Sequence, residues 1–210
     1  MANTDAPFGL RPVRYYNGSP YQGQANTYFA TGATGIIAPG DPVVLGGTTN
    51  ASKIGEYPIG MLREVQLATA GDDNPILGVC VSVLPAQGTE LNYRANSTDR
   101  IIMVADSPDL VFEVQADDDA DTTNWAVTVS GLHANLASGT ASTVYSRSVW
   151  ELDGSDVPAN DPSNQVYLLG LAKRSAEDNQ VGPFAIWEVM INQHELTPGV
   201  ISNAGRFEAK

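Results

Sequence analysis

Short apolar runs between clusters of turn-forming residues dominate the chain. The most apolar and β-branched run is Ile76–Val83, which follows the turn-like segment 71–75. A second run, Val43–Leu45, follows Pro39-Gly40-Asp41-Pro42. Turn-formers on both sides of each run give the spacing expected of strands in an antiparallel barrel or sandwich. We therefore predict that 39–83 is a small β-domain at the centre of the protein.

Further strand-like segments lie on the C-terminal side of this centre and within it. The segment 59–68 also shows apolar residues near helical spacing, but Pro58 and Gly60 at its start favour a strand. The other segments predicted as strands are 90–94, 100–105, 110–115, 125–129, 146–152, 166–173 and 184–192. The pattern predicts a mainly β protein, with small antiparallel barrel or sandwich domains and little helix.

The two ends of the chain differ from its middle. Residues 1–30 are rich in large apolar side chains, yet Pro12, Gly18, Pro20 and Gly23 interrupt every long element. This segment either covers its own core or docks on a partner chain, for instance by adding a strand to an exposed sheet edge. We predict an extended N-terminal arm (1–30), a β-barrel-like domain (31–105), a second β-rich region packed on it (106–196) and a C-terminal tail (197–210).

Composition and charge narrow the function. At 210 residues and 42% apolar, the chain is long enough to bury a core. Its net charge is −13, while residues 1–30 and 196–210 are each slightly basic. We expect no direct nucleic-acid binding, because phosphate affinity depends on clustered Lys and Arg. The N-terminus lacks a secretory pattern, and no stretch reaches the roughly 20 apolar residues of a membrane helix, so we expect cytoplasmic synthesis and no membrane partner.

Catalytic motifs are missing from the sequence. The segment His194-Glu195-Leu196-Thr197-Pro198 begins like the helical zinc-protease motif, but a proline stands where the second histidine belongs. Cys80, the single cysteine, lies in an apolar run and is predicted to be buried. There is no Gly-x-Ser-x-Gly elbow and no phosphate-binding loop. We predict no enzyme activity, no cofactor, and no catalytic or metal-binding residues.

Two features keep an alternative open. The acidic run 117–121 fails the EF-hand pattern, because Thr122 and Thr128 replace the required Gly and Glu. A solvated loop is the favoured interpretation of this run, and a looser calcium site is the alternative. Trp125, Trp150 and Trp187 are predicted to pack in a core; exposed on a sheet, they would instead form the platform of a carbohydrate-binding β-module.

Three segments carry a resemblance to a known class of proteins. They are 6–15 with the following Asn17-Gly18, the pair 40–45 and 76–79, and the segment 104–115. Together they resemble head decoration, or capsid cement, proteins of tailed bacteriophages. The resemblance implies a structural virion protein on the exterior of the expanded capsid. It would bridge neighbouring copies of the major capsid protein and associate with copies of itself as a dimer or trimer.

The arm supplies the candidate partner-binding residues. It combines apolar anchors with the basic charge that the acidic body lacks. The candidates are Phe8, Leu10, Arg11, Arg14 and Tyr15.

Overall fold

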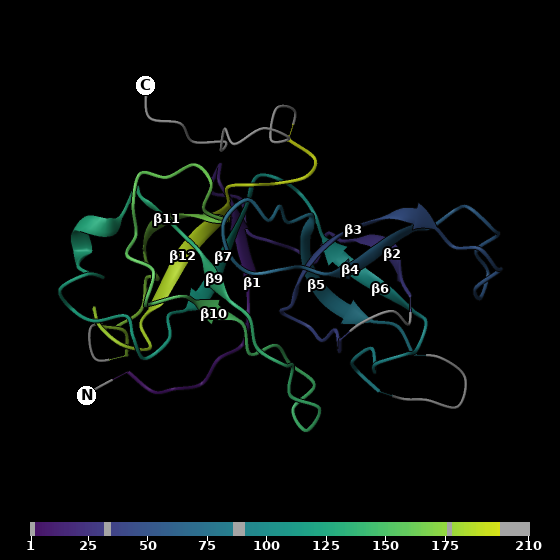
Figure 1. Cartoon of the computed structure of the whole chain (residues 1–210), viewed down its shortest axis with the longest axis horizontal. Coiled ribbons are helices and arrows are strands. Elements are labelled where there is room, and N and C mark those ends of the chain that lie inside the picture. The colour runs from purple at the N-terminus through teal and green to yellow at the C-terminus, as the bar shows by residue number, and fades with distance from the viewer. Residues whose placement is uncertain (1–2, 32–34, 86–90, 176–177, 198–210) are drawn as a thin grey trace.

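The computed structural model describes residues 3–31, 35–85, 91–175 and 178–197. Two β bodies lie side by side along the long axis of the molecule (Figure 1). The predicted mainly β fold is confirmed: over the described residues the helical structure is one 3-10 turn, Val127–Val129. No helix in these ranges is long and apolar enough to cross a membrane.

The first body is a closed barrel of five strands. Its strands are β2 (Asn26–Ala30), β3 (Pro42–Thr49), β4 (Arg63–Leu67), β5 (Gly78–Val83) and β6 (Arg100–Ala105), in the order β2-β4-β3-β5-β6. The pairs are antiparallel except for β2 and β4, which run parallel. Closure leaves the barrel without an open sheet edge.

The second body is built on a five-stranded antiparallel sheet. Its strands are β1 (Arg11–Tyr15), β7 (Leu110–Gln115), β12 (Ile186–Ile191), β11 (Val166–Leu171) and β8 (His133–Ala134), in the order β1-β7-β12-β11-β8. A two-stranded ribbon of β9 (Leu136–Ala137) and β10 (Glu151–Leu152) accompanies it. All three tryptophans are fully buried in this body, and the rings of Trp125 and Trp187 meet edge to face at 5.9 Å.

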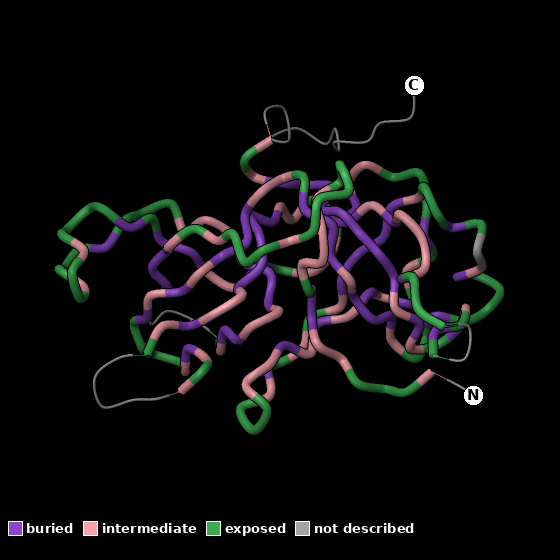
Figure 2. Tube along the Cα trace, turned by 180° about the vertical axis from the view of Figure 1, so that it is seen from behind, coloured by how far each residue is buried: buried purple, intermediate pink, exposed green. Residues whose placement is uncertain are grey.

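The run 76–83 contributes to both hydrophobic cores. Leu77 and Cys80 point into the barrel, whereas Ile76 and Val79 pack with the core of the second body. The backbone N–H of Ile76 also donates to the carbonyl of Gln193, which follows β12. This run therefore joins the two bodies. Figure 2 shows these buried strands surrounded by exposed loops.

The predicted arm, 1–30, contains two strands of the fold. β1 pairs with β7 of the same chain, and its outer side is partly covered because Tyr15 N–H donates to Ser19 and Tyr21 N–H donates to Val13. β2 is a barrel strand, so the barrel begins at Asn26 rather than at residue 31. The predicted tail lies outside the described residues beyond Thr197.

Three predicted strands were wrong. The segment 90–94 forms no strand over its described residues 91–94, where Arg94 makes an isolated bridge with Ile37. The segment 125–129 contains the 3-10 turn Val127–Val129 in place of a strand. The Asp121 carboxylate accepts the backbone N–H groups of Thr123 and Asn124 and so turns the chain before Trp125. The segment 146–152 forms a strand only over its last two residues, which make up β10. Its first part belongs to a tight hairpin in which Ser146 has a φ of 50°.

Candidate partner-binding surface

The N-terminal segment is held against its own chain at a close three-way contact. Gly9, with a φ of 71°, passes between the carbonyl oxygen of Gly40 and the side chain of Ser148. The next backbone N–H, that of Leu10, donates to the Gly40 carbonyl at 2.9 Å, and the Leu10 side chain is fully buried. Leu10, predicted to bind a partner, is a core residue here.

Arg11 belongs to a charged cluster that crosses the sheet. Its guanidinium pairs with Glu113 on β7 and lies 5.0 Å from the centre of the Phe8 ring. Arg174 donates to the same Glu113 carboxylate at 2.7 Å. Burial raises the pKa of Glu113, but the hydrogen bonds from the two arginines outweigh burial and leave this pKa below its ordinary value. Phe8 is half-buried, and more than half of the Arg11 side chain remains in solvent.

The other two predicted binding residues are also engaged within the chain. Arg14 pairs with Glu188 on β12 at 2.6 Å. Tyr15 packs against the core of the second body, and its hydroxyl lies 3.4 Å from the Gln24 side chain. The structure thus places all five predicted residues on one segment, and three of them, Phe8, Leu10 and Arg11, line an open cavity.

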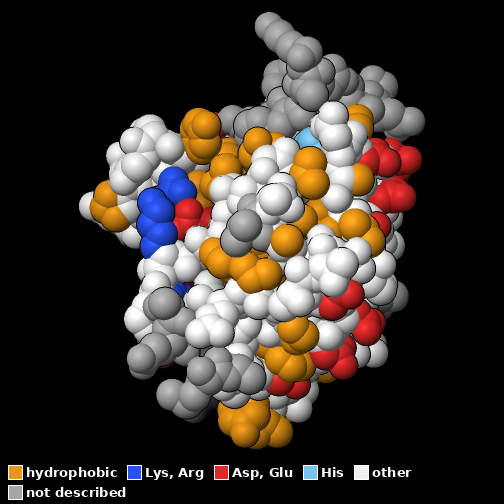
Figure 3. All heavy atoms as spheres, turned by 90° about the vertical axis from the view of Figure 1, so that its left-hand side faces the viewer, with side chains coloured by type: hydrophobic (Ala, Val, Ile, Leu, Met, Phe, Trp, Pro, Cys, Tyr) orange, Lys and Arg blue, Asp and Glu red, His pale blue; other side chains and the backbone are white. Residues whose placement is uncertain are grey.

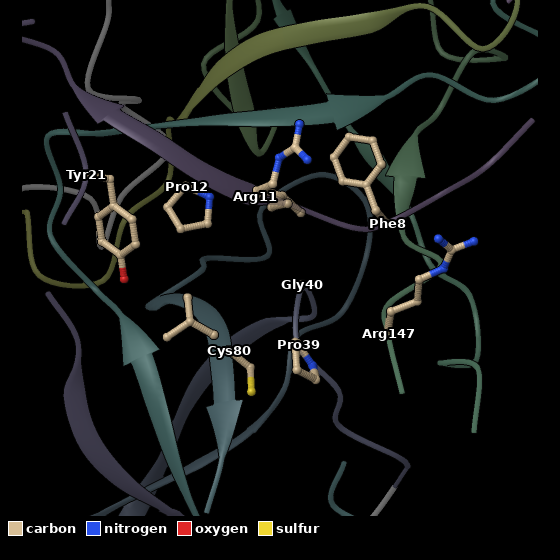
Figure 4. A pocket seen from close by; sticks show the side chains of 10 residues that line it. Phe8, Arg11, Pro12, Tyr21, Pro39, Gly40, Cys80 and Arg147 are labelled. Carbon is tan, nitrogen blue, oxygen red and sulfur yellow. The ribbon is translucent and has the colours of Figure 1, made fainter. Parts of the chain in front are cut away.

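This cavity, which we call the junction pocket, has a volume of about 390 Å³ and lies where the arm crosses the barrel. Figure 4 shows Phe8, Arg11 and Pro12 on one side of it and Pro39, Gly40 and Cys80 on the other. Tyr21, Leu10 and Val81 complete its apolar lining, and Arg147 approaches from a third segment. Val81 lies at the register shift between β5 and β6, so a local bulge shapes the pocket floor.

Arg147 was missed by reasoning from the sequence. It closes the hairpin 142–147, where Ser142 and Arg147 exchange backbone hydrogen bonds of 2.9 and 3.3 Å. The hairpin tip exposes Val144 and Tyr145, which are 82% and 72% accessible. The sequence held one signal: Arg147 is the only basic residue between 101 and 172, a stretch with eleven acidic ones.

The acidic loop offers carboxylates but uses some of them internally. Asp117, Asp118 and Asp119 have carboxylate oxygens within 4.8 Å of one another, and Asp121 does not join them. The Asp117 carboxylate accepts the backbone N–H groups of Gly154 and Asp119 at 2.9 and 3.1 Å. The loop therefore has a structural role in joining two segments. Figure 3 shows acidic side chains gathered along one side of the molecule.

Burial raises the pKa of two further carboxyl groups, those of Glu151 and Asp41. Burial, followed by the charges of Asp5, Asp117 and Asp118, raises the pKa of Glu151 to about 7. At the three-way contact, burial raises the pKa of Asp41 to about 6, although Ser148 and the Ala38 N–H donate to its carboxylate. Asp41 is fully buried beside the junction pocket, a position that the sequence did not reveal.

The remaining candidates for chemistry are buried. His194 is fully buried and forms a parallel bridge with Ile76, while the following Glu195 accepts the Leu45 N–H at 2.8 Å. Cys80 is buried in the barrel, as predicted, and burial raises the pKa of its thiol. The buried tryptophans confirm the predicted core packing, so they form no exposed platform for a sugar.

Comparison with known proteins identified no relative: no family model, no curated protein and no solved structure matches the chain.

Proposed function

We propose that this protein is a structural, non-enzymatic virion component that binds the outer surface of a tailed-phage capsid. In this role it bridges adjacent copies of the major capsid protein and stabilises the expanded shell. The proposal rests on the resemblance of 6–15, 40–45, 76–79 and 104–115 to capsid cement proteins, and on one structural observation described next.

That observation is the placement of exposed apolar side chains on two projecting loops, one on each body. The loop between β3 and β4 exposes Ile59 and Met61, which are 69% and 62% accessible. The hairpin of the second body exposes Val144 and Tyr145. Figure 1 shows the two loops leaving the molecule in different directions. A rigid body with two separate apolar contacts can join two neighbouring subunits, and a lattice multiplies such weak contacts through avidity.

The acidic body fits this role. With a net charge of −13, the protein has little electrostatic attraction for nucleic acid, which suits a position outside a DNA-filled shell. Copies of this chain arranged as a dimer or trimer would match the local symmetry axes of a capsid.

The test is co-sedimentation with capsid shells prepared in expanded and unexpanded forms. We expect stoichiometric binding to expanded shells. The double variants Ile59→Ser/Met61→Ser and Val144→Ser/Tyr145→Ser should each weaken it at least tenfold. Glu56→Gln, on the same barrel loop as Ile59, is the matched control and should bind normally. Undiminished binding by both double variants would remove the apolar loops from the proposal.

A further inference from the structure

The junction pocket combines an apolar lining with an arginine at its edge. Most of its lining side chains are hydrocarbon or aromatic, supplied by the arm, by residues 39–40 and by β5. Its volume of about 390 Å³ is at the lower end of the range typical of ligand pockets. Arg147 lines the cavity from a third segment, and Figure 4 shows it at the edge of the pocket on the same side as Phe8.

The charge of Arg147 is available to a ligand. Among the described residues the ion pairs involve Arg11, Arg14 and Arg174, and Arg147 forms none. Its Nε is buried without a hydrogen-bond partner in the described part of the chain, and its guanidinium lies 5.3 Å from the centre of the Tyr145 ring. Since no carboxylate of the described residues forms an ion pair with Arg147, its positive charge lies unpaired by them beside an apolar cavity.

This combination fits one ligand chemistry. A large apolar side chain gains by leaving water for the pocket, and a carboxylate pairs with a guanidinium through two parallel hydrogen bonds. Arg11 contributes less to such a pair, because its guanidinium is already bound to Glu113.

The surroundings of the pocket favour a polypeptide over a small molecule. Arg147 is both a lining residue and the last residue of the hairpin, so the exposed Val144 and Tyr145 extend the apolar surface beyond the cavity. A second copy of this chain is a poorer occupant, because it would bring a further net charge of −13 to an already acidic body.

We propose that the junction pocket and the adjoining hairpin tip bind a segment of a partner polypeptide that carries a large apolar side chain and a nearby carboxylate. The apolar side chain enters the pocket between Phe8 and Val81, and the carboxylate pairs with Arg147. The inference goes beyond the proposed function, since it does not depend on the partner being a capsid protein.

The experiment uses the full chain and fluorescein-labelled nonapeptides of glycine and serine. Each peptide carries Phe or Ser at one position and Asp or Asn at a second position, with zero to three residues between the two. Binding is measured by fluorescence polarisation. We expect at least one Phe/Asp spacing to bind at least tenfold more tightly than its Ser/Asp and Phe/Asn counterparts. Arg147→Gln should abolish the preference for Asp and leave the preference for Phe, whereas Arg147→Lys should retain part of both. Arg63→Gln, at an exposed arginine on the barrel, is the control and should behave like the unmodified protein.

Three results would overturn the proposal. One is the lack of any Phe/Asp preference across the spacings, and another is a preference that survives Arg147→Gln. The third is evidence for a different occupant. If octanoate competes as strongly as the best peptide, the pocket binds small amphiphiles. If the protein self-associates in sedimentation velocity and Arg147→Gln abolishes the association, the pocket binds a second copy of the chain.

Discussion

Replacing Gly9 by alanine should disrupt the close contact of the N-terminal arm with Gly40 and Ser148. A Cβ at this position would lie 2.3 Å from the Gly40 carbonyl oxygen and 2.4 Å from the Ser148 Cβ. Neither neighbour can swing aside, because one is backbone and the other is the first atom of a buried side chain. The positive φ of 71° adds about 1–2 kcal/mol for a residue with a Cβ. Overpacking costs about 1–3 kcal/mol, and loss of the Leu10–Gly40 hydrogen bond costs about 1 kcal/mol.

The expected loss for Gly9→Ala is therefore about 3–6 kcal/mol in the free energy of unfolding. Gly23→Ala is a matched control: its φ is 81°, but no atom of the described residues lies within 4 Å of the added Cβ, so its cost should stay near 1–2 kcal/mol. Urea titration followed by tryptophan fluorescence measures both, since the three buried indoles report on the second body. Equal losses for the two variants would refute the close contact of Gly9 with Gly40 and Ser148.

Three further predictions concern buried side chains. Folding raises the pKa of Asp41 from 3.8 to about 6, so the free energy of unfolding should fall by about 3 kcal/mol in total as pH rises through this window. Urea titrations between pH 4 and 8 should show that Asp41→Asn lacks this pH-dependent loss. The same pH dependence in the variant and the unmodified protein would contradict the prediction. Gln115 donates to the carbonyls of Thr4 and Phe184 and accepts the Ala6 N–H, each at 2.9 Å. Gln115→Leu should lower the free energy of unfolding by about 1–3 kcal/mol and speed amide hydrogen exchange at Ala6. Unaltered exchange at Ala6 would argue against these hydrogen bonds. Leu77→Ala should cost about 2–5 kcal/mol by opening a cavity in the barrel, and a cost below 1 kcal/mol in thermal or urea unfolding would show that Leu77 is not a core residue.

The sequence predicted the strands whose pattern is continuous. The β-branched runs that became β5, β6, β11 and β12 are long enough for periodicity and turn residues to define them. The sequence pattern did not reveal β1 and β2. Pro12, Gly18 and Gly23 interrupt the apolar pattern in this segment, and the two strands are stabilised by the distant partners β7 and β6. Pro12 is tolerated because it lies at an edge strand next to a register shift.

The candidate site was less predictable than the fold. Leu10, Arg14 and Tyr15 look like partner-binding groups in the sequence, since an isolated arm has no visible ion-pair or packing partner. In the structure Glu188, the partner of Arg14, lies about 170 positions away in the chain, and Glu113, the partner of the neighbouring Arg11, about 100 positions away. Arg147 and Val81 meet at the junction pocket through the same kind of long-range contact, which no local pattern encodes.

Cryo-electron microscopy of expanded capsid shells incubated with the full chain tests the central claim most directly. The account predicts ordered density for both β bodies on the outer surface, with the loop carrying Ile59 and Met61 and the hairpin carrying Val144 and Tyr145 on adjacent major capsid subunits. Bare shells at saturating protein concentration, or a protein that touches a single subunit, would contradict it.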